Sequence, residues 1–369
     1  MKYEVVQLGD ICDFTYGDSL KETVRNGGNV PVYGSNGIVG WHDKPLTKGE
    51  TLIVGRKGSI GEVHLSKIPC WPIDTTYYIE KTKVPCDFTW LYYMLLSIDL
   101  TRLNKSAAVP GLNRDDAYEQ RLPLPPLPEQ HRIAAMLRRT DDLRRMQRYA
   151  DVLSASLLRS VFLEMFGDPL KNSNKLEVGK LAGVGTLERG RSKNRPRNAP
   201  ELYGGKYPFI QTGDIANAGT YIRSYQQTYS ELGLKQSRLW KSGTLCITIA
   251  ANIAKTAIMT FDACFPDSVV GFNPNKKVNV EYIQCWLSFL QKKLEETAPE
   301  SAQKNINLEI LRDLDIPVPP LSEQERFARV VRWVEALRRR QAEARRQGEG
   351  LFQGLLHQSF GEDENEFHS

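Results

Sequence analysis

Residues 122–168 read LPLPPLPEQHRIAAMLRRTDDLRRMQRYADVLSASLLRSVFLEMFGD, and residues 316–362 read IPVPPLSEQERFARVVRWVEALRRRQAEARRQGEGLFQGLLHQSFGE. The two segments align without a gap at an offset of 194 positions, and about 17 of their 47 positions are identical. Self-similarity of this kind indicates one structural unit that occurs twice. The chain is therefore organised as a variable region, a repeat, a second variable region and a second repeat.

Each copy of the repeat is expected to form one long helix. The proline run at its start is extended, because proline lacks a backbone N–H and restricts the residue before it. A helix then begins near Glu129 and near Glu323, where an acidic residue suits the positive end of the helix dipole. Apolar residues follow at alternating spacings of three and four, which is typical of a coiled coil. We therefore expect two long antiparallel helices that form a coiled coil. The alternative is that each helix packs only on its own domain.

The predicted seam of this helix pair combines apolar and small polar residues. Gln147 and Gln341 fall on it, where a buried polar residue can fix the register, although solvent-exposed glutamines are the alternative. Ser154 and Gly348 occupy equivalent seam positions, which would allow the helices to approach closely. The apolar seam residues are Ile133, Met136, Leu143 and Leu157 in the first copy and Phe327, Val330, Leu337 and Leu351 in the second.

The two variable regions are predicted to be mixed domains of strands, loops and a few helices, so the fold class is α+β. Both hold short alternating runs broken by Gly, Pro and Asn. Residues 48–54 parallel residues 241–247, and each segment reads as a turn that enters a buried strand. The predicted boundaries are 1–121 for the first domain, 122–169 for the first helical spacer, 170–315 for the second domain and 316–369 for the second spacer.

Composition limits the class of protein. The net charge of +5 and the pI of about 8.7 are compatible with a nucleic-acid partner but do not establish one. The six cysteines form no CxxC pair, which argues against a zinc site and against a secreted disulfide framework, so we expect reduced thiols. Neither a signal peptide nor a run of about 18 apolar residues is visible in the sequence. We therefore expect a cytoplasmic protein without a membrane partner.

The sequence carries no recognisable catalytic motif. The two Pro-Pro pairs lack the flanking residues of an amino-methyltransferase motif, and Pro266-Asp267 has no downstream E-x-K of a nuclease. A phosphate-binding GxxxxGK[ST] loop is absent, and the five histidines show no metal-ligand spacing. We therefore expect a non-catalytic chain with no metal site and no cofactor of its own.

Two basic loops are candidates for contact with nucleic acid. Arg56 and Lys57 lie in the glycine-flanked segment GRKGSIG (residues 55–61), and arginine is the usual bidentate partner of guanine. An ordinary solvated turn is the alternative. The segment ERGRSKNRPRN (residues 188–198) carries five basic residues, which suits phosphate contact or a solvated face.

The repeated PxPPLxEQxR motif, followed by a heptad helix, closely resembles the specificity subunit of type I restriction–modification systems. The segments PVYGSNGIVGW (31–41), LIVGRKGSIGEV (52–63) and DTTYYI (74–79) are similar to one version of that family's target recognition domain. PFIQTGDI (208–215), LCITIAANIAKTAIM (245–259) and ACFPDSVVGF (263–272) are similar to another version. The second repeat departs slightly from the first, because it contains three additional glycines that lower helix propensity.

This resemblance implies a division of labour. Each target recognition domain would read one half of a bipartite asymmetric site in double-stranded DNA through the major groove, and the helix pair would set the spacer between the halves. Two methylation subunits would dock on this chain and use S-adenosylmethionine to methylate adenine N6. Restriction subunits, which are ATP- and Mg-dependent motor–nucleases, would complete the complex. The candidate DNA-binding residues are Ser35, Asn36, Arg56, Lys57, Thr75 and Thr76 in the first domain and Arg191, Lys193, Thr212 and Asn252 in the second.

Two other functions remain open at this point. The chain could be the recognition subunit of a related fused methyltransferase–nuclease system of the type IIB kind, in which one polypeptide carries both partner activities. It could also be a coiled-coil adaptor that binds proteins and not DNA. The identity of the partner separates the first alternative from the resemblance, and sequence-dependent DNA binding excludes the second.

Overall fold

The computed structural model describes residues 3–103, 111–193, 196–250, 253–297 and 306–360. Residue contacts divide the chain into two compact units. Unit 1 comprises Met1–Arg148 and Glu343–Ser369, and unit 2 comprises Tyr149–Ala342. Each unit therefore contains one mixed domain together with part of both long helices. This division differs from the four segments that the sequence suggests, because each domain packs on the helix segments that enter it.

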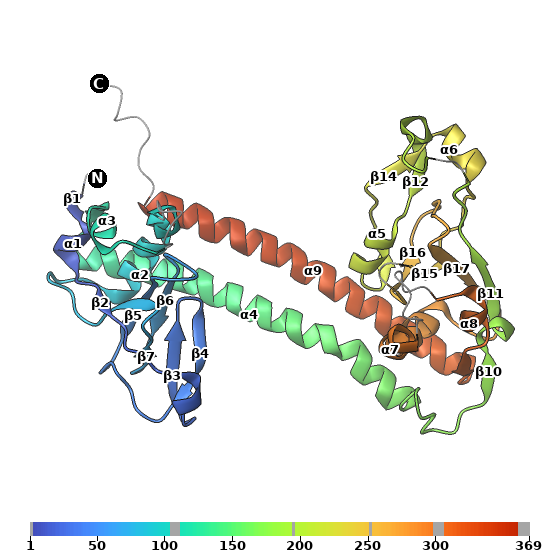
Figure 1. Cartoon of the computed structure of the whole chain (residues 1–369), viewed down its shortest axis with the longest axis horizontal. Coiled ribbons are helices and arrows are strands. Elements are labelled where there is room, and N and C mark those ends of the chain that lie inside the picture. Colours follow the sequence, from blue (N-terminus) through green and yellow to red (C-terminus); the bar gives the residue numbers. More distant parts are fainter. Residues whose placement is uncertain (1–2, 104–110, 194–195, 251–252, 298–305, 361–369) are drawn as a thin grey trace. The chain divides into compact units, whose positions relative to one another are not determined.

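Unit 1 holds three small sheets (Figure 1). The largest is antiparallel with the order β2-β8-β5-β6, the second has the order β4-β3-β7, and β1 pairs with β9. The strands are β1 (Glu4–Gln7), β2 (Thr15–Tyr16), β3 (Val30–Gly34), β4 (Gly37–His42), β5 (Thr51–Gly55), β6 (Val63–Ser66), β7 (Trp71–Pro72), β8 (Thr76–Ile79) and β9 (Arg121–Leu124). The helices are α1 (Leu8–Ile11), η1 (Glu22–Val24), α2 (Phe88–Ile98), η2 (Leu100–Leu103) and α3 (Arg114–Tyr118).

Unit 2 is built around a five-stranded sheet with the order β11-β17-β15-β16-β13. Two further pairs, β12 with β14 and β10 with β18, complete its sheets. The strands are β10 (Val178–Lys180), β11 (Gly185–Arg189), β12 (Tyr203–Phe209), β13 (Tyr221–Ile222), β14 (Gln227–Tyr229), β15 (Leu245–Thr248), β16 (Thr256–Met259), β17 (Val269–Pro274) and β18 (Asp315–Pro317). The helices are η3 (Leu181–Gly183), η4 (Pro200–Leu202), α5 (Thr212–Asn217), α6 (Glu231–Gln236), α7 (Val280–Thr297) and α8 (Leu308–Arg312).

The two units share one core topology. The strand order β2-β8-β5-β6 in unit 1 corresponds to β11-β17-β15-β16 in unit 2. In both sheets, the buried central strand, β5 or β15, pairs antiparallel with both of its neighbours. The last residue of the central strand lies opposite the first residue of β8 or β17, Gly55 opposite Thr76 and Thr248 opposite Val269. The strand β1 pairs with β9 just as β10 pairs with β18. The parallel between residues 48–54 and 241–247 therefore has a physical basis, since both segments lead into the central strand.

The two repeats form the helices α4 (Leu127–Phe166) and α9 (Leu321–Phe360), each of 40 residues. Each begins two residues before the predicted acidic residue. The helix starts directly after the Pro-Pro pair, where the carbonyls of Pro126 and Pro320 accept the first helical N–H groups. The glycines of the second repeat do not interrupt α9. At 1.5 Å per residue, such a helix is about 60 Å long.

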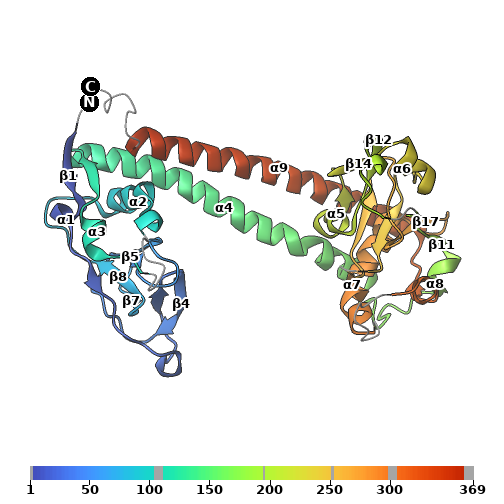
Figure 2. The same ribbon diagram turned by 45° about the horizontal axis from the view of Figure 1, so that its top comes forward.

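Within each unit, the segments of α4 and α9 lie side by side (Figures 1 and 2). In unit 1, Arg144 bonds Glu349 at 2.7 Å, and the Gln147 side chain donates to the carbonyl of Ala344 at 3.2 Å. In unit 2, the Ser154 hydroxyl donates to Gln341 at 3.1 Å. Residue numbers rise along α4 as their partners' numbers fall along α9, so the helices are antiparallel.

The buried stripe departs from the predicted seam at one position in each helix. Leu143 and Leu351 are 52% and 54% exposed, so their assignment to the seam is wrong. The neighbouring residues take their places: the Arg144 guanidinium, whose side chain is only 16% exposed, lies 4.1 Å from the centre of the buried Phe352 ring. Apolar residues spaced by four and then three positions fit a heptad as well as residues spaced by three and then four. The sequence therefore allows both patterns, and only side-chain packing selects one of them. Of the other predicted residues, Ile133 and Phe327 are buried and Met136, Leu157, Val330 and Leu337 are half-buried.

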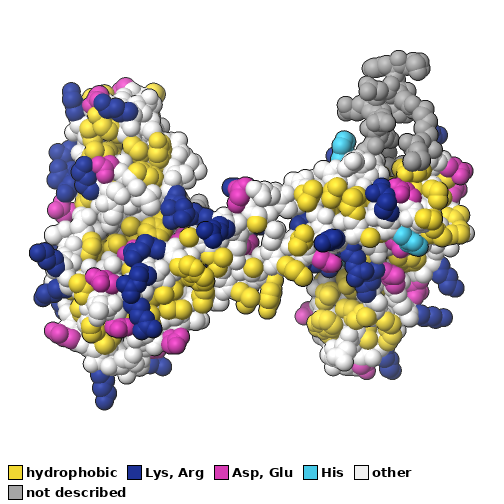
Figure 3. Space-filling view, turned by 180° about the vertical axis from the view of Figure 1, so that it is seen from behind, with side chains coloured by type: hydrophobic (Ala, Val, Ile, Leu, Met, Phe, Trp, Pro, Cys, Tyr) yellow, Lys and Arg dark blue, Asp and Glu magenta, His cyan; other side chains and the backbone are white. Residues whose placement is uncertain are grey.

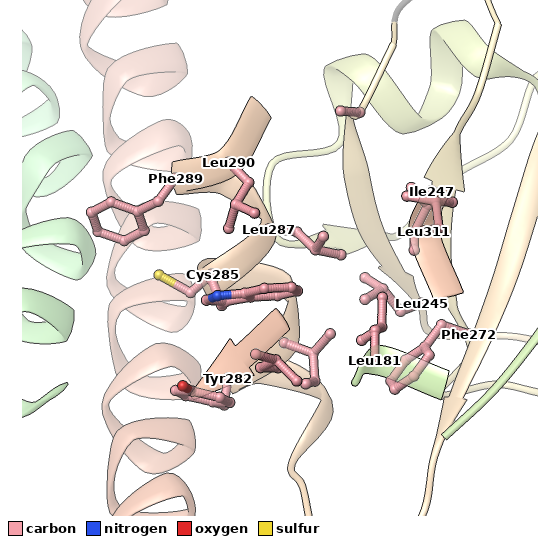
Figure 4. Packing of buried hydrophobic residues seen from close by; sticks show 14 of the residues in the cluster. Leu181, Leu245, Ile247, Phe272, Tyr282, Cys285, Leu287, Phe289, Leu290 and Leu311 are labelled. Carbon is pink, nitrogen blue, oxygen red and sulfur yellow. The ribbon is translucent and has the colours of Figure 1, made fainter. Parts of the chain in front are cut away.

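Each domain core continues into both long helices. In unit 1 the core includes Ile133 and Leu137 of α4 and Phe352 and Leu356 of α9. In unit 2, α7 packs on the sheet, with Leu287 directed toward the side that carries Leu245 (Figure 4). Tyr282 and Phe289 point to the opposite side, where both rings lie against Phe162 of α4. The helix residues Leu158, Phe162, Phe166, Phe327, Val331 and Val334 join this core. Helix ends that belong to a domain core are anchored by the hydrophobic effect as well as by contact with each other.

Candidate nucleic-acid interface

In unit 1, the chain segments that follow β5 and precede β8 meet at one edge of the four-stranded sheet. The pairing of Gly55 with Thr76 places the end of β5 beside the start of β8. The backbone N–H groups of Arg56 and Lys57 both donate to the carbonyl of Thr75, at 2.9 and 3.1 Å. We call the segments 56–62 and 72–75, with Tyr16 at the end of β2, the loop edge of unit 1.

The turn that carries Ser35 and Asn36 lies against this loop edge. A Cβ atom added at Gly58 would lie 3.2 Å from the Ser35 hydroxyl oxygen, and one added at Gly55 would lie 3.2 Å from the Ser35 Cβ. Glycine at these two positions therefore allows the close approach. The structure thus brings five predicted residues to one place: Ser35, Asn36, Arg56, Lys57 and Thr75.

Thr76 has a different role from the predicted one. Its side chain is fully buried, and its hydroxyl donates to the carbonyl of Ile73 at 2.7 Å. The hydroxyl therefore closes the turn before β8 and is not accessible to a base. The structure contradicts Thr76 as a DNA contact, because Asp74-Thr75 faces outward while the next residue already belongs to the sheet.

The guanidinium of Arg56 is held in a defined position. Its Nη2 donates to the backbone carbonyl of Asp74 at 2.6 Å, and the guanidinium carbon lies 5.2 Å from the centre of the Tyr16 ring. The Tyr77 ring is 5.9 Å away, and burial raises the pKa of this tyrosine to about 12, so its phenol is neutral beside the cation. The buried Nε of Arg56 has no hydrogen-bond partner among the described residues. Folding alone therefore does not satisfy this side chain.

Unit 2 has an equivalent loop edge, formed by the end of β11 and the segments that follow β15 and precede β17. The backbone N–H of Ile249 donates to the carbonyl of Ser268 at 2.9 Å, as Arg56 does to Thr75. The N–H of Ala254 donates to Thr248 at 2.8 Å, as Gly61 does to Gly55. Of the predicted residues in this loop, Asn252 lies outside the described residues.

The other predicted residues of unit 2 are more dispersed. Thr212 is half-buried at the start of α5, which follows β12. The last residue of β12, Phe209, forms a parallel bridge with Cys264 in the segment before β17, and β3 pairs in parallel with β7 in the same way. Thr212 and Ser35 therefore follow equivalent strands. Arg191 and Lys193 are exposed, and the Arg191 carbonyl accepts from Ser237 at 2.9 Å. Among the described residues, no recorded contact joins Arg191 or Lys193 to Thr212.

Basic residues that are not among the individually named candidates also lie in unit 2, two of them in the predicted basic segment 188–198. Arg189 donates to the backbone carbonyl of Asp267 and Arg197 to its carboxylate, two residues before β17. A groove between α5, β13 and α9 is lined by Arg223, Arg338 and Arg339. Lys and Arg side chains gather in a band on the face of unit 2 that Figure 3 shows.

The described part of the chain contains no group of three or more His, Cys, Asp or Glu residues arranged to hold a metal ion. None of its helices is long and apolar enough to cross a membrane.

The internal duplication corresponds to a known family. A family model for the type I restriction modification DNA specificity domain matches residues 1–152 and again residues 174–342. The chain belongs to this family. It is a specificity subunit of the type I restriction–modification kind, and such subunits are generally non-catalytic DNA-recognition proteins.

Individual relatives agree with this assignment. The chain is 24% identical over 267 residues to a type I restriction enzyme specificity subunit of Methanocaldococcus jannaschii, a match that covers 67% of this chain and 61% of that one. It is 22% identical over 333 residues to one of Haemophilus influenzae, covering 86% and 83%. Among solved structures, the S subunit from M. genitalium superimposes with a TM-score of 0.68 at 17% identity, covering 98% and 97%. A chain from a structural study of type I complex assembly has a TM-score of 0.56 at 18% identity, covering 97% of both chains. These structures share the α+β fold with two recognition domains and long helices.

Proposed function

We propose that this specificity subunit reads a bipartite asymmetric DNA site, one half with each domain. The observation that carries the proposal is the pair of equivalent loop edges. Both edges are held by the same backbone hydrogen bonds, yet their side chains differ, with Arg56 in unit 1 where unit 2 has Ile249. A common scaffold with different side chains at the surface suits two readers with different targets, because sequence is read by side chains that reach base edges.

The helix pair is proposed to set the spacer between the half-sites. Each helix is continuous over 40 residues, and both of its ends belong to domain cores. A continuous helix has a fixed rise per residue, so its length is a ruler. The polar contacts Gln147 to Ala344 and Ser154 to Gln341 support a single register, because a slip of either helix would leave these groups without partners.

We propose that two methylation subunits dock on the helix pair. Exposed apolar side chains lie along α4, and hydrophobic atoms are visible on the surface of the helices in Figure 3. Contiguous exposed apolar residues in a soluble protein indicate an interaction surface. In unit 1 these residues are Leu143 and Met146, which are 52% and 68% exposed, and in unit 2 they are Tyr149, Val152 and Leu153.

The chemistry is assigned to the partners. Methylation subunits would supply S-adenosylmethionine and transfer its methyl group to adenine N6, and restriction subunits would supply ATP- and Mg-dependent cleavage in the cytoplasm. This chain would contribute the choice of site and no catalytic group. Membership of the family and the likeness to a chain studied for type I complex assembly support this division.

A methylation map tests the proposal directly. N6-methyladenine would be mapped across genomic DNA from cells that carry the methylation subunits, with and without this chain. We expect a split motif with a fixed gap to appear only in its presence. Unchanged methylation would overturn the proposal and favour an adaptor. Purification of the methylating complex separates the type I assignment from a fused methyltransferase–nuclease, because the partners are then either separate chains or one.

A further inference from the structure

Two equivalent aspartates each hold an arginine through the backbone. Asp74 and Asp267 both lie two residues before the last strand of their sheet, β8 and β17. In unit 1, Arg56 Nη2 donates to the carbonyl of Asp74 at 2.6 Å. In unit 2, Arg189 Nε donates to the carbonyl of Asp267 at 3.0 Å. The same point on the two loop edges therefore carries a guanidinium.

The two arginines come from different strands. The position equivalent to Arg56 is Ile249, because the backbone N–H of each residue donates to the loop before the last strand. The backbone carbonyl of Arg56 accepts from the N–H of Leu112 at 2.9 Å, and that of Ile249 accepts from the N–H of Ile306 at 3.0 Å. Arg189 instead ends β11, whose counterpart in unit 1 is β2, ending at Tyr16. At these two positions, unit 1 therefore has Tyr16 and Arg56, whereas unit 2 has Arg189 and Ile249.

Two glycines confirm that Tyr16 and Arg189 are equivalent positions. Gly17 donates its N–H to Thr76 at 3.0 Å, and Gly190 donates to Val269 at 2.8 Å. A Cβ atom at Gly17 would lie 2.1 Å from the carbonyl oxygen of Ile73. One at Gly190 would lie 2.3 Å from the carbonyl oxygen of Pro266. Only glycine allows this approach, so the residue before each glycine is fixed beside the loop.

Both guanidinium groups keep donors for a ligand. A guanidinium has five N–H donors, and the carbonyl bond uses one. The Asp267 carboxylate is paired with Arg197 at 2.7 Å, and among the described residues Arg189 has no recorded carboxylate partner. Arg189 is exposed, and its charge therefore faces solvent uncompensated. The carbonyl bond limits its rotamers before binding, which reduces the entropy that binding must overcome.

We propose that Arg56 and Arg189 are corresponding DNA contacts, one for each half-site, and that each guanidinium donates to an acceptor of duplex DNA. The acceptors are guanine O6 and N7 or a phosphate oxygen, which present the same chemistry to a guanidinium. The inference rests on the proposed function. It adds that Arg189 has in unit 2 the role that Arg56 has in unit 1.

The test is a methylation map of four variants co-expressed with the methylation subunits. Arg56→Ala and Arg189→Ala are compared with Lys48→Ala and Lys241→Ala, which remove exposed lysines before β5 and β15, at the opposite end of the same strands. We expect Arg189→Ala to relax one base position in one half of the motif by about tenfold or more, and Arg56→Ala to do so in the other half. The lysine controls should leave the motif unchanged.

The outcome also separates base from phosphate contact. If the arginines contact phosphates, both variants weaken methylation at all sites, and the slope of log affinity against log salt falls by about 1 for the purified complex. Arg→Lys variants retain the positive charge but lose the bidentate fork of the guanidinium. Unlike the alanine variants, they should therefore preserve a phosphate contact, but they should not preserve a bidentate guanine contact. They also serve where an alanine variant fails to fold.

Two results would overturn the inference. In the first, Arg189→Ala and Arg189→Lys leave both the motif and the salt slope unchanged. In the second, the Arg56 and Arg189 variants alter the same half of the motif. Failure of the proposed function looks different, because the unaltered chain would then produce no motif at all.

Discussion

The side-chain oxygen of Gln130, in the first turn of α4, accepts a hydrogen bond from the backbone N–H of Asp87 at 2.8 Å, and Asp87 is the residue that caps α2. The amide nitrogen of Gln130 donates to the carbonyl of Pro125 at 2.8 Å, and the side chain is 1% exposed. Gln324 repeats this arrangement in unit 2, accepting from Asn279 before α7 at 2.8 Å and donating to Pro319 at 2.7 Å. The Pro-Pro-Leu-x-Glu-Gln motif therefore joins the start of each long helix to its domain.

Removal of either glutamine should destabilise its own unit. Gln130→Ala leaves the half-buried N–H of Asp87 and the buried carbonyl of Pro125 without their partner, which costs about 1–3 kcal/mol in free energy of unfolding. Amide hydrogen exchange at Asp87 should become faster in this variant, and exchange at Asn279 should become faster in Gln324→Ala. Gln347, an exposed residue of α9, gives the control, since Gln347→Ala should change stability by less than about 0.5 kcal/mol. Equal exchange at Asp87 in Gln130→Ala and the unaltered chain would contradict the link.

Exchange of one recognition domain should change one half of the target. Replacement of residues 1–121 with the corresponding domain of another specificity subunit leaves unit 2 and its loop edge intact. We expect the methylation map to show a new first half-site, the same second half-site and the same spacer. A change in both halves would show that the domains do not read independently.

Insertion of one helical turn should lengthen the spacer. Four residues added to α4 between Gln147 and Ser154, and four to α9 between Gln341 and Ala344, leave the contacts Gln147–Ala344 and Ser154–Gln341 on opposite sides of the insertion. The added rise is about 6 Å, which corresponds to about two base pairs at 3.4 Å each. Four residues in α4 alone serve as the control, and this variant should lose methylation because the register is broken. An unchanged spacer in the double insertion would reject the ruler.

A charge on the exposed face of α4 should weaken assembly with the methylation subunits without unfolding the chain. Met146 is 68% exposed, so Met146→Asp should alter the free energy of unfolding by less than about 0.5 kcal/mol. Loss of an apolar contact at a desolvated interface should raise the Kd for the methylation subunit about tenfold or more. Ile68, which is 50% exposed between β6 and β7, provides Ile68→Asp as the matched control. Equal affinity of both variants would place the docking surface elsewhere.

The thiols should react only slowly in the folded chain. All six cysteines are free, and burial raises the pKa of each, to about 12 for Cys12, Cys86 and Cys285. Because the thiolate is the reactive form, a pKa of 12 leaves about one part in ten thousand ionised at pH 8. Titration with a thiol reagent at pH 8 should therefore be slow, should accelerate as the pH rises, and should count six thiols after unfolding. A thiol that reacts at once at neutral pH would contradict this.

The sequence by itself determined the architecture. The repeat at an offset of 194 residues predicted two long helices, and the alternation of three and four predicted that they pair. Patterns of this kind are local, because helix periodicity and proline geometry act over a few residues. They can therefore be recognised without knowledge of the rest of the chain. The family followed from the same motifs, and the family comparison confirms it.

Tertiary structure decided which side chains are accessible. Arg144 and not Leu143 faces Phe352, because two heptad phases fit the sequence and the packing of α9 selects one. Thr76 is buried although Thr75 is not, because strand register begins between them. Arg189 reaches Asp267 across 78 residues of sequence, and only the pairing of β11 with β17 brings them together. Contacts between distant segments depend on the register of strands that local patterns do not specify, so the loop edges appear only in the folded chain.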